Sequence, residues 1–89
     1  MSTYDLNVAP SAERTIARLP EFAAAAIVEF ITGPLLQNPH RVGKPLLLER
    51  SSYHSARRGA YRVAYRIDAT NELVVVVRID HRADVYRTR

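Results

Sequence analysis

The sequence predicts an α+β domain in which two helices pack on one face of a mainly antiparallel four-stranded sheet. An alternating segment comes first, two segments with helical periodicity follow, and three strand-like segments occupy the C-terminal half. Tight connections join those last segments, which favours antiparallel pairing of their strands. The chain has 89 residues. That length predicts one domain, residues 1–89, in which about 60% of the unfolded surface is buried.

The N-terminal segment predicts a strand and then a helix. Tyr4, Leu6 and Val8 alternate with polar residues, which is typical of a short strand. Pro10 and Ser11 then open a helix, with Ser11 as the expected N-cap. The buried stripe of this helix has helical spacing and comprises Ala12, Ile16 and Leu19.

Pro20 ends the first helix and is well placed to begin the second. The second helix has an apolar face that we expect in the core, made of Phe22, Ala26, Ile27, Phe30 and Ile31. Gly33-Pro34 should kink or stop it, and Asn38-Pro39 ends the segment. Residues 39–50 contain two prolines and a glycine and are predicted to form a connector.

The stretch YHSARRGAYRVAYRID, residues 53–68, predicts a β-hairpin. Glycine leads the connection Gly59-Ala60, which is the signature of a type II′ turn. In the second strand, Arg62 and Arg66 alternate with aromatic and aliphatic residues, so a row of guanidinium groups should lie on one face. The opposite row should face the core and comprises Tyr61, Val63, Tyr65 and Ile67.

Two registers of this hairpin differ in which residue faces Arg62. A two-residue loop places Arg57 directly opposite Arg62, whereas a loop that takes in Arg58 places Ala56 there and leaves His54 as the functional residue of the strand. We favour the two-residue loop because it is the commoner device. The apolar run LVVVV, residues 73–77, then predicts a central strand covered on both sides.

The charge is uneven along the chain. Residues 1–49 carry four basic and five acidic residues, a net charge of −1, whereas residues 50–89 carry nine arginines and four acids, a net charge of +5. Like charges on paired strands destabilise a sheet, and arginine binds phosphate through a planar fork. The sheet is therefore predicted to meet a polyanion.

Several classes of protein are disfavoured. The chain has no cysteine, so a disulfide framework or a thiolate metal site is impossible. The three histidines lie far apart in the sequence, and we expect no metal and no cofactor. No signal peptide or run of about 20 apolar residues is evident, so we expect a soluble, cytoplasmic protein with no membrane partner.

The order of elements, the segment GAYRVAYRID and the ending RIDHRADVYR resemble the RelE-type toxins of bacterial toxin–antitoxin pairs. The resemblance covers nearly the whole chain, and PHRVGKPL and HSARRG are similar to the actinobacterial branch. It implies a RelE-like fold and a ribosome-dependent endoribonuclease that cuts mRNA in the decoding site, in contact with mRNA and ribosomal RNA. It also implies neutralisation by an acidic, RelB-like antitoxin, with operator DNA bound only through the toxin–antitoxin complex.

The resemblance also implies the site. The strand arginine of the family matches Arg62, the basic residue before the last turn matches Arg82 beside His81, and the C-terminal tyrosine matches Tyr86. Two family lysines on the preceding strand are replaced here by His54 and Ala56, so Arg57 is expected to stand in for a lysine. We assign catalysis to Arg57, Arg62, His81, Arg82 and Tyr86, and substrate binding to Lys44, His54, Arg58 and Arg66.

The chemistry of RNA cleavage explains these residue types. A base takes the 2′-OH proton, cations stabilise the phosphorane, and an acid protonates the leaving 5′-oxygen. Permanently charged Arg62 and Arg82 suit the second task, and His54 and His81 are candidates for the proton transfers because histidine changes protonation near neutral pH. Two alternatives remain: a ParE-like toxin that binds DNA gyrase without cutting, and a non-catalytic nucleic-acid or antitoxin-binding module.

Overall fold

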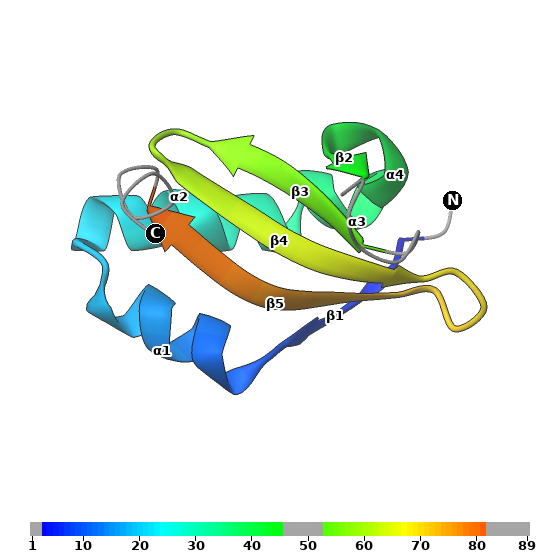
Figure 1. Cartoon of the computed structure of the whole chain (residues 1–89), viewed down its shortest axis with the longest axis horizontal. Coiled ribbons are helices and arrows are strands. Elements are labelled where there is room, and N and C mark those ends of the chain that lie inside the picture. Colours follow the sequence, from blue (N-terminus) through cyan, green and yellow to red (C-terminus); the bar gives the residue numbers. More distant parts are fainter. Residues whose placement is uncertain (1–2, 46–52, 82–89) are drawn as a thin grey trace, which may run out of the picture.

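The sheet is built around β4 (Tyr61–Asp68) and β5 (Leu73–His81). The computed structural model describes residues 3–45 and 53–81. The strand order is β1-β5-β4-β3-β2, where the outer strands are β1 (Asp5–Val8), β3 (Tyr53–Arg58) and β2 (Lys44–Pro45) (Figure 1). β1 runs parallel to β5, and the other pairings are antiparallel. The predicted fold class is confirmed, but the sheet has five strands within the described residues, because the two-residue β2 is too short to leave a periodic pattern in the sequence.

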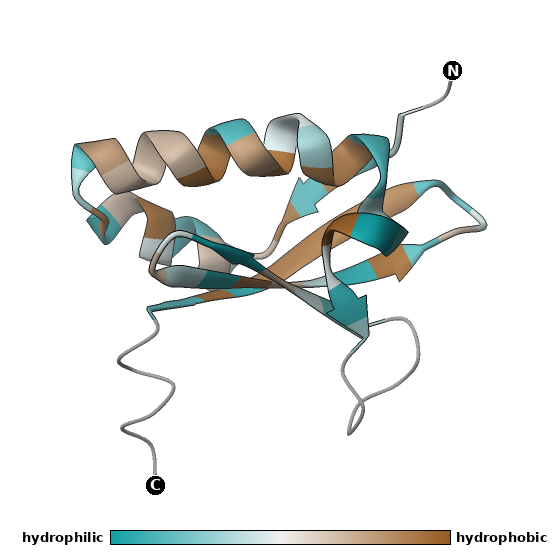
Figure 2. Ribbon diagram, turned by 90° about the horizontal axis from the view of Figure 1, so that it is seen from above, coloured by the Kyte–Doolittle hydropathy of each residue, from teal (hydrophilic) through white to brown (hydrophobic). Residues whose placement is uncertain are grey.

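Helices α1 (Pro10–Arg18) and α2 (Glu21–Thr32) lie on one side of the sheet (Figure 2). Two further one-turn helices, α3 (Pro34–Gln37) and α4 (Pro39–Val42), connect α2 to β2. The connector predicted over residues 39–50 thus contains α4 and β2 over residues 39–45, and its residues 46–50 lie outside the described part. Proline begins each short helix, where its fixed φ suits the first helical position and its missing N–H costs nothing.

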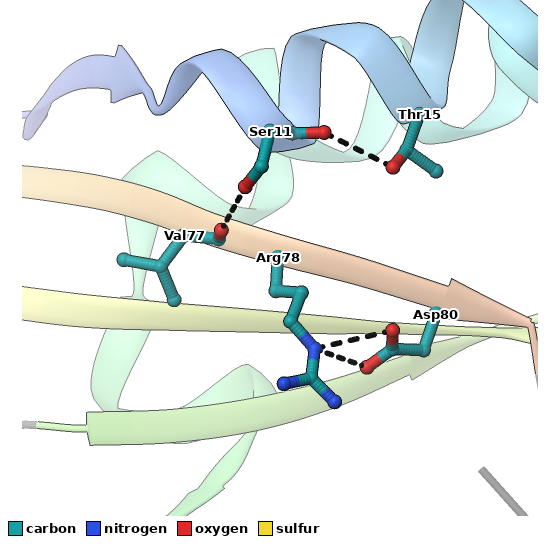
Figure 3. Close-up of polar contacts among 5 residues, drawn as sticks. All are labelled: Ser11, Thr15, Val77, Arg78 and Asp80. Atoms are coloured by element: carbon teal, nitrogen blue, oxygen red, sulfur yellow. Dashed lines mark hydrogen bonds and ion pairs between the residues drawn. The ribbon is translucent and has the colours of Figure 1, made fainter. Parts of the chain in front are cut away.

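The start of α1 differs from the prediction by two residues. Ala9 is the N-cap and Pro10 the first helical residue, so Ser11 lies inside the helix. The Ser11 hydroxyl donates a hydrogen bond to the carbonyl oxygen of Val77 at 3.1 Å, and the backbone N–H of Ala9 donates to the carbonyl oxygen of Val76 at 2.8 Å. These bonds attach the beginning of α1 to β5, with Ser11 as a tertiary contact in place of a cap (Figure 3).

The core lies between the helices and one face of the sheet. It comprises Ala12, Ile27, Phe30, Ile31, Leu35, Leu36, Ala56, Val63, Tyr65, Ile67, Val74, Val76 and Ile79, with Tyr61 packed against it. Phe22 was predicted in this core but its side chain is 88% exposed. It stands in the first turn of α2, and the core is filled by residues further along that helix.

Strand β5 is internal, but helices cover only one of its faces. Val74 and Val76 are buried on the helix side, whereas Leu73 and Val75 are half-buried on the other. The prediction of a strand covered on both sides was therefore wrong. Val75 lies directly opposite Arg66, and a neighbour with a long side chain can shield apolar surface without a helix above it.

A β-bulge in β5 sets which residues of its second half face the helices. Tyr65 lies opposite Val76, but the next pair is Ala64 with Arg78, so β5 has one extra residue, Val77. A shift of one residue exchanges the two faces of a strand. The bulge thus places Ile79 in the core and Arg78 and Asp80 on the face away from the helices.

Candidate functional site

Within residues 3–45 and 53–81, the face of the sheet away from α1 and α2 carries four arginines, and we call it the arginine face. Ala56, Val63, Tyr65 and Ile67 of β3 and β4 point into the core, so the residues that alternate with them point outward. The outward residues include Arg57, Arg62 and Arg66, and the bulge adds Arg78. The predicted separation of an apolar row and a guanidinium row on β4 is confirmed.

Arg57 and Arg62 are direct cross-strand neighbours. The hairpin loop consists of Gly59 and Ala60, and Gly59 has a φ of +62°, as the leading position of a type II′ turn requires. The favoured two-residue register is therefore confirmed. Within the described residues neither arginine forms an ion pair, so no direct contact with a carboxylate offsets the repulsion between the two positive charges.

A groove of about 570 Å³ runs beside this pair. Lys44 of β2 lies directly opposite Ser55 of β3, which brings its side chain to the groove that Arg57 and Arg62 line. Among the described residues the lining is Val42, Gly43, Lys44, Pro45, Ser55, Ala56, Arg57 and Arg62. The described residues thus place three cationic side chains around one groove, an arrangement whose charge and guanidinium geometry suit a phosphodiester backbone.

Gly43 allows β2 to approach β3 closely at one end of the groove. A Cβ atom at this position would lie 2.8 Å from the carbonyl oxygen of Ser55 and against the hydroxyl of Tyr65. The Tyr65 hydroxyl donates a buried hydrogen bond of 2.6 Å to the carbonyl oxygen of Pro39 in α4, and burial raises the pKa of Tyr65 to about 12. Tyr65 and Gly43 together hold the segment that bears Lys44 against the sheet.

A carboxylate adjoins the arginine pair on its other side. Asp80 lies directly opposite Arg62, so the row across the sheet is Arg57, Arg62 and Asp80. Arg78 Nε donates to both carboxylate oxygens of Asp80, at 3.2 and 2.9 Å (Figure 3). Sequence reasoning missed Arg78 and Asp80, because the apolar run before them gives no sign of the bulge that turns them outward.

His54 does not share this face. Its side chain is 6% exposed and lies on the helix side of β3, where its ring stacks on Tyr65 with centroids 5.7 Å apart. The ring of His40 meets it edge-on at 5.8 Å. His54 Nδ1 is buried and makes no hydrogen bond within the described part of the chain. The structure thus places His54 in the packing beneath the sheet, away from the site proposed for RNA.

Arg58 and His81 also lie on the helix side of the sheet. The Arg58 guanidinium lies over the Phe30 ring, 5.2 Å from its centroid. His81 is half-buried beside Tyr61, with ring centroids 5.0 Å apart. Arg82 and Tyr86 lie outside the described residues, so their assignments remain predictions. Of the predicted site residues, the structure brings together Lys44, Arg57 and Arg62, with Arg66 further along the same face.

Residues 3–45 and 53–81 contain neither a metal-binding cluster nor a membrane-spanning helix. In these ranges no group of three or more metal-ligating side chains comes together. None of the helices there is long and apolar enough to cross a membrane.

Comparison with known proteins places the chain among bacterial toxins. A family model described as the ParE toxin of the type II toxin–antitoxin system parDE matches residues 6–86. The toxin RelE of Mycobacterium tuberculosis is 50% identical over 84 residues, which cover 94% of this chain and 87% of that protein. The toxin RelG of the same organism is 49% identical over 84 residues, with coverages of 94% and 97%.

Solved structures agree with these matches. The RelBE2 toxin–antitoxin complex of M. tuberculosis contains a chain that superposes with a TM-score of 0.86 at 48% identity, covering 94% of this chain and 97% of that one. The isolated Escherichia coli RelE toxin superposes with a TM-score of 0.74 at 18% identity, with coverages of 93% and 90%. The latter likeness shows the fold alone.

Proposed function

This chain belongs to the ParE toxin family of type II toxin–antitoxin systems, as a RelE-type toxin of the actinobacterial kind, and we propose that it is an mRNA endoribonuclease. The observation that carries the proposal is the pairing of Arg57 with Arg62 beside Lys44, on an open sheet face. RNA is an abundant cellular partner whose regularly spaced phosphates suit such a site. The relatives named RelE and RelG support this activity over other toxin mechanisms.

The proposed reaction is a transesterification at one phosphodiester of mRNA. The ribose 2′-oxygen attacks phosphorus while its proton passes to a base, and the bond from phosphorus to the 5′-oxygen breaks as an acid protonates that oxygen. Arg57 and Arg62 grip the non-bridging oxygens and stabilise the extra negative charge of the phosphorane. We propose that Lys44 and Arg66 bind the phosphate groups on either side of the cleaved bond.

The proton transfers are assigned to the end of β5 and the residues that follow it in sequence. His54 is buried on the helix side. His81 also lies on that side but is only half-buried, so it stays a candidate with Tyr86, and Arg82 is a further cation. His81 ends β5 directly opposite Tyr61, which itself follows the hairpin loop. In this proposal the ribosome presents the mRNA and completes the site, in the cytoplasm.

An antitoxin of acidic character is proposed to cover the arginine face. Solved relatives include toxin–antitoxin complexes, among them the M. tuberculosis RelBE2 complex. Residues 50–89 have a net charge of +5, so an acidic partner would associate rapidly, at a rate that falls as salt is added. Operator DNA is proposed to be bound only through that complex.

One experiment tests the nuclease and separates it from the alternative that the family description favours, a ParE-like toxin acting on DNA gyrase. The chain is induced in cells that carry a DNA-damage reporter, and amino-acid incorporation is followed from the time of induction. We expect protein synthesis to stop first, with mRNA ends that map within codons on ribosomes. Early induction of the reporter with intact mRNA would contradict the nuclease and support gyrase poisoning.

The matched loss-of-function variants are Arg62→Ala and Arg82→Ala. Arg62 projects from the open face of the sheet, so its removal should abolish growth inhibition and leave the fold intact. Loss of a preorganised cation costs on the order of 100-fold or more in rate. Toxicity of both variants equal to that of the unaltered chain, at equal expression, would refute the catalytic assignment.

A further inference from the structure

Arg62 has two potential partners of opposite sign, a phosphate of RNA and the carboxylate of Asp80. Asp80 is its direct cross-strand neighbour on β5, and opposite charges at such positions attract. Yet within the described residues Arg62 forms no ion pair, and the Asp80 carboxylate is engaged by Arg78. Two arginines thus adjoin Asp80 in the sheet, Arg78 on the same strand and Arg62 on the opposite strand, and within the described residues Asp80 pairs with Arg78.

The bulge in β5 brings Arg78 and Asp80 to the same face of the sheet as Arg62. Arg78 and Asp80 are two residues apart on β5 and so share a face, and the extra residue Val77 turns that face outward. Arg78 lies directly opposite Ala64, whose small side chain leaves space above β4 for a guanidinium. Figure 3 shows the Arg78 side chain folded toward Asp80, with Nε directed at both carboxylate oxygens.

We propose that Arg78 is a positioning residue that holds the Asp80 carboxylate away from Arg62, and so keeps Arg62 available for the phosphate of RNA. The inference rests on the proposed function. Without Arg78, the Asp80 carboxylate would turn to the guanidinium opposite it and compete with RNA for the same charge. The Asp80 side chain is 24% exposed and that of Arg78 69%, so the pair serves the charge pattern of the surface more than the stability of the fold.

The proposal differs from a simpler role for Arg78 as one more phosphate contact. Its terminal guanidinium nitrogens make no hydrogen bond within residues 3–45 and 53–81, so direct contact with RNA is the competing explanation. The two roles give different results when Asp80 is neutralised. A positioning residue becomes dispensable without the carboxylate that it restrains, whereas a phosphate contact remains useful.

The test is a double-mutant cycle on the full chain. Binding of a short fluorescent 2′-O-methyl RNA, which lacks the nucleophilic hydroxyl and cannot be cut, is measured for the unaltered chain, Arg78→Ala, Asp80→Asn and the double variant at one salt concentration. We expect Arg78→Ala to weaken binding about fivefold and Asp80→Asn to strengthen it about two- to fivefold. The double variant should bind as Asp80→Asn does, within about twofold.

Two controls make the cycle decisive. Arg66→Ala removes an arginine from the same face that lies opposite Val75 instead of a carboxylate, so its effect should be the same with and without Asp80→Asn. Thermal unfolding of all variants should coincide within about 2 °C, because an exposed ion pair contributes little stability.

The outcomes separate this inference from the proposed function. An equal loss of affinity for Arg78→Ala in both backgrounds would overturn the positioning role and leave the nuclease proposal standing. The expected coupling without mRNA cleavage in a translating extract would support the positioning role and contradict the nuclease. Failure of the unaltered chain to bind the RNA would overturn the positioning role, whereas cleavage of mRNA on ribosomes would still decide the nuclease proposal.

Discussion

Arg57 and Arg62 face each other directly across β3 and β4, with no acidic group paired to either among the described residues. Two guanidinium groups in this relation repel each other by a few tenths of a kcal/mol or more. A phosphate placed between them reverses the sign of the interaction. The repulsion therefore slightly destabilises the free protein, and under the proposed function RNA binding would remove it.

The first prediction concerns Arg57→Ala. We expect mRNA cleavage to fall on the order of 100-fold while the free energy of unfolding rises by a few tenths of a kcal/mol, because the repulsion with Arg62 is removed. Primer extension on translated mRNA measures the first quantity and urea unfolding the second. Arg18→Ala is the matched control and should leave cleavage unchanged without raising stability, because Arg18 is a cation in the last turn of α1. Full cleavage by Arg57→Ala would show that Arg57 is no substitute for a lysine.

The second prediction concerns His54→Ala. His54 is buried against Tyr65 and His40 on the helix side, so its truncation should cost about 1–3 kcal/mol of stability through lost packing. Cleavage per folded molecule should change little. Urea unfolding and mRNA cleavage, both measured well below the unfolding temperature, check this. A fully folded His54→Ala variant that cannot cleave mRNA would show that His54 takes part in the site.

The third prediction concerns Gly43→Ala. The added methyl would meet the backbone carbonyl of Ser55 at 2.8 Å, and the backbone of β3 cannot yield as a flexible side chain could. We expect a loss of about 1–3 kcal/mol and weaker RNA binding, because β2 and Lys44 would shift away from β3. Thermal unfolding and RNA titration measure the two effects. A variant with unchanged stability and unchanged affinity would show that the close approach does not position Lys44.

The fourth prediction concerns alkaline pH. Burial raises the pKa of Tyr65 from 10.0 to about 12, so the folded state holds this proton more tightly than the unfolded chain. The resulting stabilisation is complete below pH 10 and is lost as the pH rises from 10 toward 12.

Urea unfolding across that range should show the decline, and Tyr65→Phe should show a smaller one. The variant should also be less stable at neutral pH by about 1–2 kcal/mol, because the Pro39 carbonyl loses its buried donor. Identical slopes above pH 10 for both proteins would refute the assignment to Tyr65.

The fifth prediction concerns Ser11→Ala. The Ser11 hydroxyl donates to the carbonyl of the bulged residue Val77, so its loss should cost about 0.5–1.5 kcal/mol and loosen the bulge that turns Arg78 outward. Hydrogen exchange of the β5 amides should therefore accelerate near the bulge. Thr15→Ala is the matched control, because its hydroxyl bonds to Ser11 within the helix; equal effects of the two changes would show that the bulge does not depend on Ser11.

The sequence by itself was sufficient for the fold class, the hairpin and its charge pattern. Gly59 leads a two-residue loop, and a period of two separates arginines from core residues on β4. These features are local, because a turn and its adjoining strands are set by a few neighbouring residues. The opposition of Arg57 and Arg62 follows directly from that turn and could be predicted.

Only the tertiary structure decided what surrounds that pair. Lys44 reaches the groove because a two-residue strand pairs with β3 where Gly43 admits close approach. Phe22 is exposed because later turns of α2 fill the core. Both outcomes depend on contacts between segments distant in sequence, which no periodic pattern records.

The bulge at Val77 shows most directly why the sequence pattern could not predict the surroundings of the arginine pair. The run LVVVV contains nothing that marks one residue as unpaired, yet hydrogen bonds from Ala9 and Ser11 meet the carbonyls of Val76 and Val77. Because side chains alternate with a period of two, that single extra residue exchanges the faces of the β5 residues that follow it. The local alternation of side chains determined that Arg62 would point outward. The bulge, which lies where α1 packs against β5, places Asp80 directly opposite Arg62 and Arg78 on the same face.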